Sequence, residues 1–499
     1  MAASPRSRGR AWVGVDLGTQ SVRAVVVGDT GAVLGQGSSA LDSTRWPDGR
    51  HEQDARQWWD AVVRAAASAM AQAGTADIAG IACCGTSGTV LLVADTESDP
   101  ASPLGPGLMY DDTRAADQAA RVRDLPARAW AAAGISPQRT WALPKALWLV
   151  DRGRPPGRVR LAHQVDVINS RLIGRPAAAD TSNALKTGID PIAGSWPAED
   201  LDRLGLDPGL LPPLAAPGQV LGHVCARASE RTGIPAGVPV VAGMTDGCAA
   251  QIAAGVLRPG QWNLVVGTTT VLKGVSDSLL HDPTGALYSH RSPDGRWWPG
   301  GASSAGAGLL SQQFEPSEYD ALDARAAERE PAGCLTYPLA TVGERFPFRR
   351  PDAQRLTIGQ PRDDADRYAA ILQGVAFVER LCLDHVRALG ASVGERVTVT
   401  GGGARSAYWT QLQADILGRT VLVPRLAEGA VGMAVLAASH VGTLAEAAGR
   451  MLDEVGQFRP RPGARQRFDG RYAELVAALR ARDWIGEDLA ASALSGVES

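Results

Sequence analysis

The fold is decided by the stretch Trp12-Val-Gly-Val-Asp-Leu-Gly-Thr-Gln-Ser-Val-Arg-Ala-Val-Val-Val27, which opens the patterned part of this 499-residue chain. Apolar residues flank a turn that contains Gly18, so the stretch predicts a strand, a tight turn and a second strand. A third strand is expected over residues 32–37, followed by a helix from about Asp54, its N-cap, to Ala73. The polar, basic residues 1–10 are expected to be disordered.

A second strand–turn–strand unit is expected from Trp262 to Val275, around Gly267-Thr-Thr-Thr270. Gly267 lies half a chain after Gly18, which indicates two halves that each open with the same kind of hairpin. Later segments predict a helix over 366–389, a strand over 396–400 and a helix over 406–417. The chain is too long for one ordinary core, so the sequence predicts an α/β protein of two domains.

Bulk composition excludes several classes of protein. Hydrophobic residues make up 45% and charged residues 21%, and the net charge is −3. Neither nucleic acid nor a membrane is therefore expected as a partner. Six Cys without a Cys-x-x-Cys pair indicate neither a disulfide framework nor a zinc site. With no apolar signal segment behind residue 10 and no run long enough to span a bilayer, we expect a cytoplasmic protein. The sequence leaves a monomer and a homodimer both open.

Two Gly-Thr turns are candidate phosphate-binding sites. In Asp16-Leu-Gly-Thr-Gln-Ser21, backbone N–H groups of the turn could bind phosphate oxygens. The Asp16 carboxylate could face phosphate only across a cation, which indicates Mg²⁺. Gly267-Thr-Thr269 has the same chemistry in the second half. Each could also be an ordinary turn, but one such turn in each half favours a nucleotide site.

Glycines also separate a strand from a helix at Gly401-Gly-Gly403-Ala-Arg-Ser406. They allow a ligand to approach the backbone closely, as adenosine would. A dinucleotide-binding turn looks similar, but the strand after it normally ends in an acidic residue. Here that strand, 420–423, is followed by Pro424 and Arg425. An oxidoreductase therefore lacks its ribose-binding carboxylate at the expected place.

Asp246 follows an apolar strand that begins near Val240 and precedes a helix rich in small residues. At such a junction an Asp is usually a helix N-cap, and its position alone favours that interpretation. The alternative is a catalytic carboxylate.

Taken in order, these motifs resemble the FGGY carbohydrate kinases from about Trp12 to about Ala438. His51-Glu-Gln-Asp with Trp59, Tyr110-Asp-Asp-Thr-Arg114, Lys145-Ala-Leu-Trp-Leu and Asp166 to Gly174 are similar to further segments of that family. The resemblance implies two actin-like ATPase (RNase H-like) domains, over 11–252 and 253–485, with a catalytic cleft between them. It also implies an ATP-dependent kinase that uses Mg²⁺.

The resemblance further implies a role for each matching residue. Asp16 would organise Mg²⁺, and Asp246 would accept the proton of the sugar hydroxyl. The residues expected at the phosphates are Gly18, Thr19, Gln20, Ser21, Gly267, Thr268 and Thr269. Those expected at the adenosine are Gly401, Gly402, Gly403 and Ser406. Those expected at the sugar are Gly85, Thr86, Ser87, Gly88, Tyr110, Asp112 and Arg114. Thr86, Ser87 and Thr89 could equally be residues of a plain hairpin between strands over 78–82 and 90–94.

The sugar is expected to be a ketopentose. Gly85-Thr-Ser-Gly-Thr89 lacks the Met-His pair typical of xylulokinases, and together with Ser182-Asn-Ala-Leu-Lys186 it looks like the D-ribulose kinase branch. The sequence thus predicts phosphorylation of D-ribulose at its terminal C5 hydroxyl, with D-xylulose or another polyol as the alternative. An actin-like ATPase that needs no sugar and a nucleotide-dependent oxidoreductase are more distant alternatives.

Overall fold

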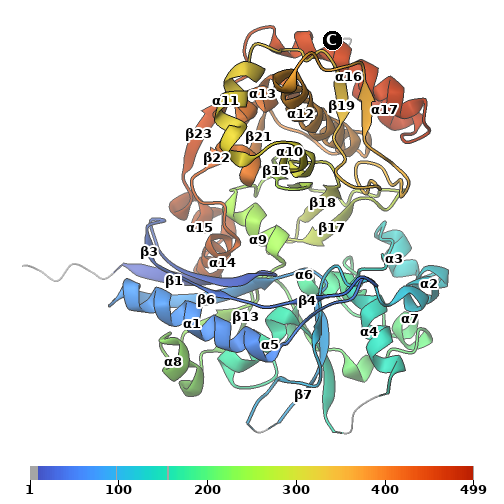
Figure 1. Ribbon diagram of the computed structural model, residues 1–499. Coiled ribbons are helices and arrows are strands. Elements are labelled where there is room, and N and C mark those ends of the chain that lie inside the picture. Colours follow the sequence, from blue (N-terminus) through green and yellow to red (C-terminus); the bar gives the residue numbers. More distant parts are fainter. Residues whose placement is uncertain (1–8, 97, 154–156, 498–499) are drawn as a thin grey trace, which may run out of the picture. The chain divides into compact units, whose positions relative to one another are not determined.

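The computed structural model describes residues 9–96, 98–153 and 157–497. Of the segment predicted to be disordered, residues 1–8 lie outside this range, while Arg10 already belongs to the first strand. The chain packs as two compact units, coloured along the sequence in Figure 1. The first unit contains the chain up to Gly255 together with His290–Gly295 and Leu426–Asp453. The second contains Val256–Ser289, Arg296–Arg425 and the chain from Glu454 on.

The main sheet of the first unit has the strand order β13-β14-β6-β1-β2-β3. The predicted hairpin is present as β1 (Arg10–Leu17) and β2 (Ser21–Gly28), and β3 (Val33–Ala40) continues the antiparallel meander. On the other side of β1 come β6 (Asp77–Gly85) and β14 (Pro239–Val241), both parallel, and then antiparallel β13 (Val220–His223).

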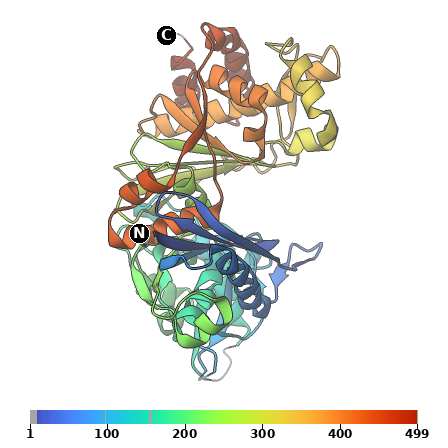
Figure 2. The ribbon, with the colours of Figure 1, turned by 90° about the vertical axis from the view of Figure 1, so that its left-hand side faces the viewer.

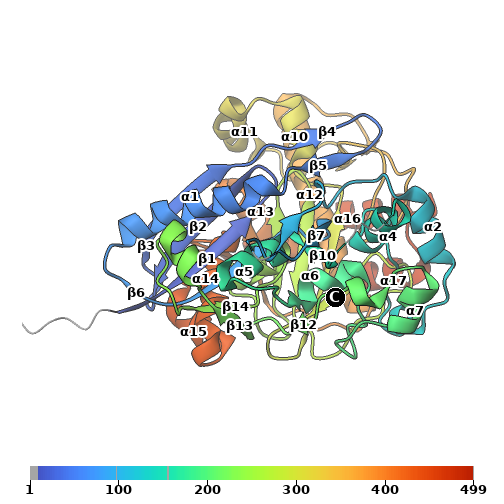
Figure 3. The same cartoon turned by 90° about the horizontal axis from the view of Figure 1, so that it is seen from below.

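Helices cover both faces of this sheet. Helix α1 (Arg56–Ala73) packs on β2 and β3, and α14 (Gly429–Ala438) packs on β1 and β6 from the opposite face (Figure 1). Figure 3, seen from below, shows α1 lying across these strands. In Figure 2 the red helix α14 lies beside the blue strands, although about 400 residues separate them in sequence, and α15 (Leu444–Met451) packs on α14. Helix α1 begins two residues after Asp54, whose Oδ1 accepts the backbone N–H of Arg56 at 3.0 Å.

A second sheet of the first unit contains β7 (Val90–Ala94), and this corrects one expectation. Both predicted strands around residues 85–89 exist, but β6 and β7 belong to different sheets and do not form a hairpin. Strand β7 instead pairs antiparallel with β10 (Val159–His163). The remaining strands of this sheet are β4 (Thr44–Arg45), β5 (His51–Gln53), β8 (Ser102–Pro103) and β9 (Gly107–Leu108).

Further elements complete the first unit. They are α2 (Ala116–Asp124), α3 (Arg128–Ala132), α4 (Ala142–Asp151), α5 (Gln164–Ile173), β11 (Ala179–Asp180), α6 (Thr181–Ala184), the 3₁₀ turn η1 (Leu185–Thr187), α7 (Ala198–Arg203), η2 (Pro208–Leu210), β12 (Leu214–Ala215), α8 (Ala226–Thr232), α9 (Asp246–Ala253) and η5 (Ser439–Val441).

The sheet of the second unit repeats the pattern of the first. Strands β18, β16 and β15 form an antiparallel meander, β21 and β22 follow in parallel, and β23 is antiparallel. The order and directions match those of β3, β2, β1, β6, β14 and β13 one by one. This supports the inference that the two halves share one ancestral unit. The strands are β15 (Trp262–Val266), β16 (Thr270–Gly274), β17 (Tyr288–Arg291), β18 (Trp297–Ser303), β21 (Arg396–Thr400), β22 (Thr420–Pro424) and β23 (Glu454–Phe458).

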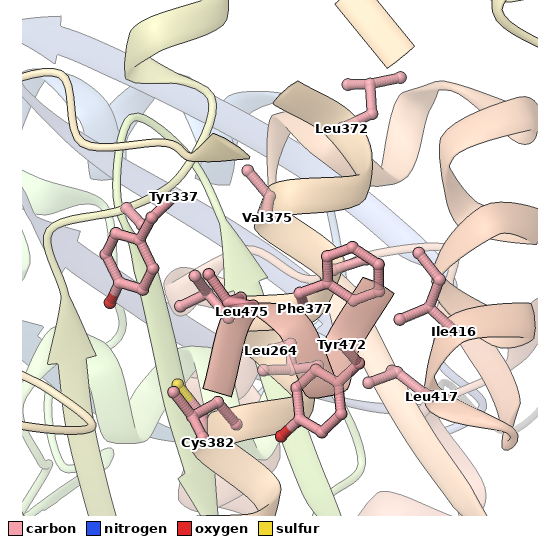
Figure 4. Close-up of a cluster of buried hydrophobic side chains, with 14 of the residues drawn as sticks. Leu264, Tyr337, Leu372, Val375, Phe377, Cys382, Ile416, Leu417, Tyr472 and Leu475 are labelled. Atoms are coloured by element: carbon pink, nitrogen blue, oxygen red, sulfur yellow. The ribbon is translucent and has the colours of Figure 1, made fainter. Parts of the chain in front are cut away.

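Helix α12 (Asp364–Ala388) is the centre of the second unit's core. Leu372, Val375 and Phe377 of this helix lie among buried side chains of β15, α13 (Ala407–Leu417) and α16 (Ala464–Arg480) (Figure 4). Burial of so many apolar side chains on one helix fixes the strands beside it. The remaining elements are α10 (Gly308–Gln313), η3 (Pro316–Glu318), α11 (Tyr319–Ala326), β19 (Leu335–Tyr337), β20 (Leu356–Ile358), η4 (Gly402–Arg405) and α17 (Glu487–Ser495).

Candidate active site

The turn between β1 and β2 keeps donors available for a ligand. The Gly18 N–H donates to Ser21 O at 3.0 Å, and Gln20 O accepts the N–H of Leu41 at 2.8 Å. Among the described residues, no protein acceptor takes the backbone N–H of Thr19 or Gln20. Gln53 connects the turn to helix α1, because its Nε2 donates to Thr19 O at 2.6 Å while its Oε1 accepts the Trp58 indole N–H at 2.8 Å.

Asp16 is the last residue but one of β1, beside this turn, and it is partly buried. Cys84 of the adjacent strand donates its thiol proton to Asp16 Oδ1 at 3.3 Å. Helix α14 begins against the same carboxylate, so that a Cβ atom at Gly429 would lie 3.0 Å from Asp16 Oδ2. Burial, and after it the negative charge of Asp246, raises the pKa of Asp16 to about 6. The two carboxylates therefore lie within electrostatic range of each other.

Asp246 is the first residue of α9, and Thr245 occupies the N-cap position. The interpretation of Asp246 as the N-cap is thus wrong, because the N-cap is the residue before it. Its Oδ1 instead accepts the N–H of Gly247 at 2.7 Å. Thr245 pairs with Gly85 at the end of β6 in a parallel bridge. This bridge brings the segment at residues 85–89 and Asp246 to one edge of the sheet.

Within that segment, the structure separates the side chains predicted to meet the sugar. Thr86 is 4% exposed, and its hydroxyl lies 3.0 Å from Gln164 Oε1 and 2.5 Å from the hydroxyl of Thr89. It is therefore occupied inside the protein and does not face a ligand. Ser87 is half-buried, and Gly88 has φ of +99°, a conformation that favours glycine.

In the stretch Tyr110 to Arg114, one predicted side chain is exposed and others are bonded inside the protein. Tyr110 is 39% exposed, and burial followed by the charges of Asp111 and Asp246 raises its pKa, so it lies near the catalytic candidate. Asp112 is fully buried and accepts the backbone N–H of His51 at 2.7 Å and the guanidinium of Arg114 at 2.7 Å. Because protein donors occupy its carboxylate, Asp112 supports the loop, which corrects its predicted contact with sugar.

Arg114 is held just as firmly. Its guanidinium pairs with Glu52 at 2.6 Å as well as with Asp112, and it lies 4.9 Å from the ring centroid of Trp148. Two carboxylates and an aromatic face leave it a structural role at the Tyr110 loop.

In the second unit, the turn at Gly267 to Thr269 is fixed by the start of α10. Gly267 N donates to Thr269 O at 3.0 Å, and the carbonyl oxygens of Gly267 and Thr268 accept the N–H groups of Ala307 and Gly308 at 2.8 and 3.0 Å. Thr268 is exposed. The turn therefore presents its outer side to solvent, as a phosphate-binding turn must.

The three glycines after β21 are required for different reasons. A Cβ atom at Gly401 would lie 2.6 Å from Val266 O, and one at Gly403 would lie 2.7 Å from Val266 Cγ1. Packing against β15 therefore explains both. Gly402 is exposed and has only one atom near such a Cβ, at 3.9 Å. Packing within the protein therefore does not explain a glycine at this position.

Ser406 caps helix α13, and its hydroxyl is already engaged. Its Oγ accepts the N–H of Trp409 at 3.0 Å and donates to Asp323 Oδ2 at 2.6 Å. The other oxygen of Asp323 accepts the hydroxyl of Tyr368 at 2.8 Å. Any contact of Ser406 with adenosine would therefore come through its backbone or in exchange for one of these bonds.

No pattern in the sequence indicated Gln164 or Asp323. Gln53 and Lys145 lie in segments similar to those of the family, but their roles could not be predicted. Lys145 is fully buried on α4, and its Nζ donates to Met109 O at 2.7 Å, next to Tyr110. Burial lowers its pKa to about 7. Each of these side chains acts on a partner far away in sequence, so local patterns carried no signal for their contacts.

Among the described residues, no group of three or more His, Cys, Asp or Glu side chains could enclose a metal ion. Within the same part of the chain, no helix is both long and apolar enough to cross a membrane.

The two units share one sheet order and each carries a glycine-containing hairpin. The comparisons with known proteins make the chain a phosphotransferase of the carbohydrate kinase class. Residues 11–253 match the N-terminal domain of the FGGY family of carbohydrate kinases, and residues 262–441 match its C-terminal domain. The chain belongs to the FGGY family of carbohydrate kinases, as the sequence motifs predicted.

Relatives and solved structures agree with this assignment. A xylulose kinase of Streptomyces rubiginosus is 32% identical over 441 residues, covering 85% of this chain and 87% of that protein. The Escherichia coli xylulose kinase is 28% identical over 428 residues, covering 82% and 85%. The crystal structure of a Rhodospirillum rubrum xylulose kinase superposes with a TM-score of 0.83 at 27% identity, over 95% of this chain and 99% of that one. The predicted two-domain α/β kinase fold and the ATP-dependent kinase activity are thereby confirmed.

Gln53 provides a direct test of how the first hairpin is held. Replacing Gln53 by Leu removes the hydrogen bond to Thr19 O, so the turn should move and the KM for ATP should rise about tenfold, as expected for one hydrogen bond. The KM for the sugar should change little. Steady-state kinetics with ATP as the varied substrate measures this.

Gln57→Leu is the matched control, since Gln57 bonds the backbone of Asp42 through both ends of its amide and makes no hydrogen bond to the turn within the described residues. An unchanged KM for ATP in Gln53→Leu, or an equal rise in both variants, would show that Gln53 does not set the turn.

Proposed function

We propose that this protein transfers the γ-phosphoryl group of ATP to the terminal C5 hydroxyl of a ketopentose, with D-ribulose as the preferred substrate, giving the 5-phosphate and ADP. The observation that carries the proposal is the pair of carboxylates, Asp16 and Asp246, at the edge of the sheet that also bears the segment at residues 85–89. One carboxylate serves the phosphate side of the reaction and the other the sugar side.

Asp246 is proposed as the general base. Phosphoryl transfer passes through a loose transition state, so little proton abstraction is needed until the sugar oxygen attacks. A carboxylate at the start of α9 is suited to accept the proton late in that step. The nearby Tyr110 side chain, partly exposed and close enough to feel the charge of Asp246, is proposed to line the sugar site.

Asp16 is proposed to hold Mg²⁺ that ATP brings. Mg²⁺ commonly keeps several waters and takes one or two carboxylates together with phosphate oxygens, and a single carboxylate with Asp246 and Glu428 nearby fits that habit. When bound, the ion neutralises charge on the phosphate oxygens. Its charge would also favour the ionised form of Asp16, whose pKa is raised by burial and, after it, by the negative charge of Asp246.

The remaining nucleotide contacts are assigned unit by unit. In the first unit, Gly18, Thr19, Gln20 and Ser21 are proposed to bind phosphate, supported by the available N–H groups of Thr19 and Gln20. In the second unit we propose that phosphate meets Gly267, Thr268 and Thr269 and that adenosine meets Gly401, Gly402, Gly403 and Ser406. The open space at Gly402 supports the adenosine contact most directly.

The choice of D-ribulose rests on the segment at residues 85–89, where no Met-His pair stands and the threonine hydroxyls are turned inward. D-Xylulose is the second candidate, because relatives that cover most of the chain are named xylulose kinase. The two sugars differ only in configuration at C3, so a small change in the shape of the site decides between them.

A panel of acceptors tests the substrate. The purified protein is assayed for ADP release with ATP, Mg²⁺ and D-ribulose, D-xylulose, ribitol, xylitol, glycerol or gluconate. We expect the highest kcat/KM with D-ribulose and the next with D-xylulose. The reverse order would favour the second candidate, and ADP release that needs no acceptor would contradict the kinase proposal.

Replacing Asp246 by Asn tests the base. Because a general base typically contributes about 10²–10⁴-fold, kcat should fall by at least about 100-fold while the fold and the KM for ATP are retained. Asp364→Asn is the matched control, since Asp364 is likewise the first residue of its helix, α12. Turnover of Asp246→Asn close to that of this control would refute the assignment.

A further inference from the structure

The segment Gly85 to Thr89 leaves β6 at the sheet edge and is held in shape by side chains from distant elements. Gln164, the first residue of α5, uses its Oε1 to accept both the backbone N–H and the hydroxyl of Thr86, each at 3.0 Å. A Cβ atom at Gly85 would lie 2.9 Å from the same Oε1. Gln164 thus fixes two consecutive residues of the segment.

Lys186, in the 3₁₀ turn η1, holds the segment at a second point. Its Nζ donates to Ser87 O at 3.2 Å, and its Cδ would lie 3.2 Å from a Cβ at Gly88. Gly88 also has positive φ, so this part of the backbone admits little variation. Together, the side chains of Gln164 and Lys186 contact the four consecutive residues 85–88.

One buried hydrogen-bond network lies next to both Gln164 and Lys186 in sequence. The ring of His163, next to Gln164, lies 2.7 Å through Nδ1 from Asp166 Oδ2 and 2.7 Å through Nε2 from Thr187 Oγ1. Thr187 is the neighbour of Lys186 in sequence. His163, Asp166 and Thr187 are each at most 1% exposed. These buried hydrogen bonds connect the backbone next to Gln164 with the backbone next to Lys186. The network is closed to solvent, so it does not contact a substrate directly.

What the segment offers a ligand follows from these bonds. The hydroxyls of Thr86 and Thr89 bond each other at 2.5 Å inside the protein. This leaves the half-buried Ser87, whose buried Oγ has no hydrogen-bond partner among the described residues, as the side chain of the segment that can meet a sugar. A hydroxyl discriminates between sugar configurations only if the backbone that carries it is fixed, since a loose segment adapts to either epimer.

We infer that Gln164 and Lys186 are positioning residues that set the sugar selectivity of this enzyme by fixing the main chain of residues 85–88. The inference rests on the proposed function, because it presumes that this segment borders the sugar. It assigns selectivity to two side chains that act through the segment and do not themselves touch the sugar.

The test compares selectivity rather than activity. Gln164→Met keeps the side-chain volume but removes the acceptor for Thr86. The ratio of kcat/KM for D-ribulose to that for D-xylulose should fall at least about tenfold, the effect of losing one or both of the hydrogen bonds from Thr86, while the KM for ATP stays the same. Gln164→Glu, which retains an acceptor oxygen, should restore at least part of the ratio.

Asn169→Leu is the matched control. Asn169 is 1% exposed on the same helix α5, so this substitution perturbs an equally buried polar site with no hydrogen bond to the segment among the described residues. Its selectivity ratio should equal that of the wild type, whatever its stability. Lys186→Met removes the hydrogen bond to Ser87 O and should lower the same selectivity ratio. It serves as the test if Gln164→Met fails to fold.

The outcomes separate the inference from the proposed function. A selectivity ratio unchanged in folded Gln164→Met and Lys186→Met, in a wild type that does phosphorylate ketopentoses, overturns the inference alone. A wild type that prefers a different polyol overturns the proposed substrate, and the ratio of its two best acceptors then carries the same test. A wild type that phosphorylates no acceptor overturns both.

Discussion

Close backbone packing around the carboxyl end of β1 is the constraint on which the candidate site depends. A Cβ atom at Gly14 would overlap Ala430 O, one at Gly432 would overlap Ala249 O, and one at Gly243 would overlap Cys83 O. These glycines let β1, α14, α9 and β6 meet without side chains between them. Asp16 and Asp246, both partly buried, therefore come within electrostatic range of each other.

This packing has an electrostatic consequence. Burial and the neighbouring carboxylate both disfavour the ionised form of Asp16, and its raised pKa records that cost. A cation beside Asp16 would remove the repulsion, and a hydroxyl beside Asp246 would find a carboxylate ready to accept a proton. The arrangement that disfavours the ionised form of Asp16 thus suits the substrates of a kinase.

Sequence alone predicted the parts of the fold that local patterns encode. Both hairpins, α12 and the strand before Gly401 are close to their expected bounds, since alternation and glycine turns are short-range signals. The placement of β6 and β7 in different sheets was not predicted. It follows from the pairing of β7 with β10, a strand distant in sequence, beside which Gln164 accepts a hydrogen bond from Thr86 across 78 residues.

For the candidate site, sequence indicated which residues belong together but not which way they face. Thr86 and Asp112 matched family motifs, yet their polar atoms are bonded inside the protein. Gln53 stood in a quoted motif, but its hold on Thr19 O joins residues 34 positions apart. Such contacts arise only from tertiary packing, so no local pattern could reveal them.

The central claim is that this site transfers phosphate to the terminal hydroxyl of a ketopentose, and the product tests it most directly. D-Ribulose labelled with ¹³C at C5 is incubated with ATP, Mg²⁺ and the protein, and the product is examined by ³¹P NMR. The account predicts one new phosphomonoester whose phosphorus couples to the labelled carbon, formed in equal amount with ADP. A phosphomonoester without that coupling, or inorganic phosphate alone, would contradict it.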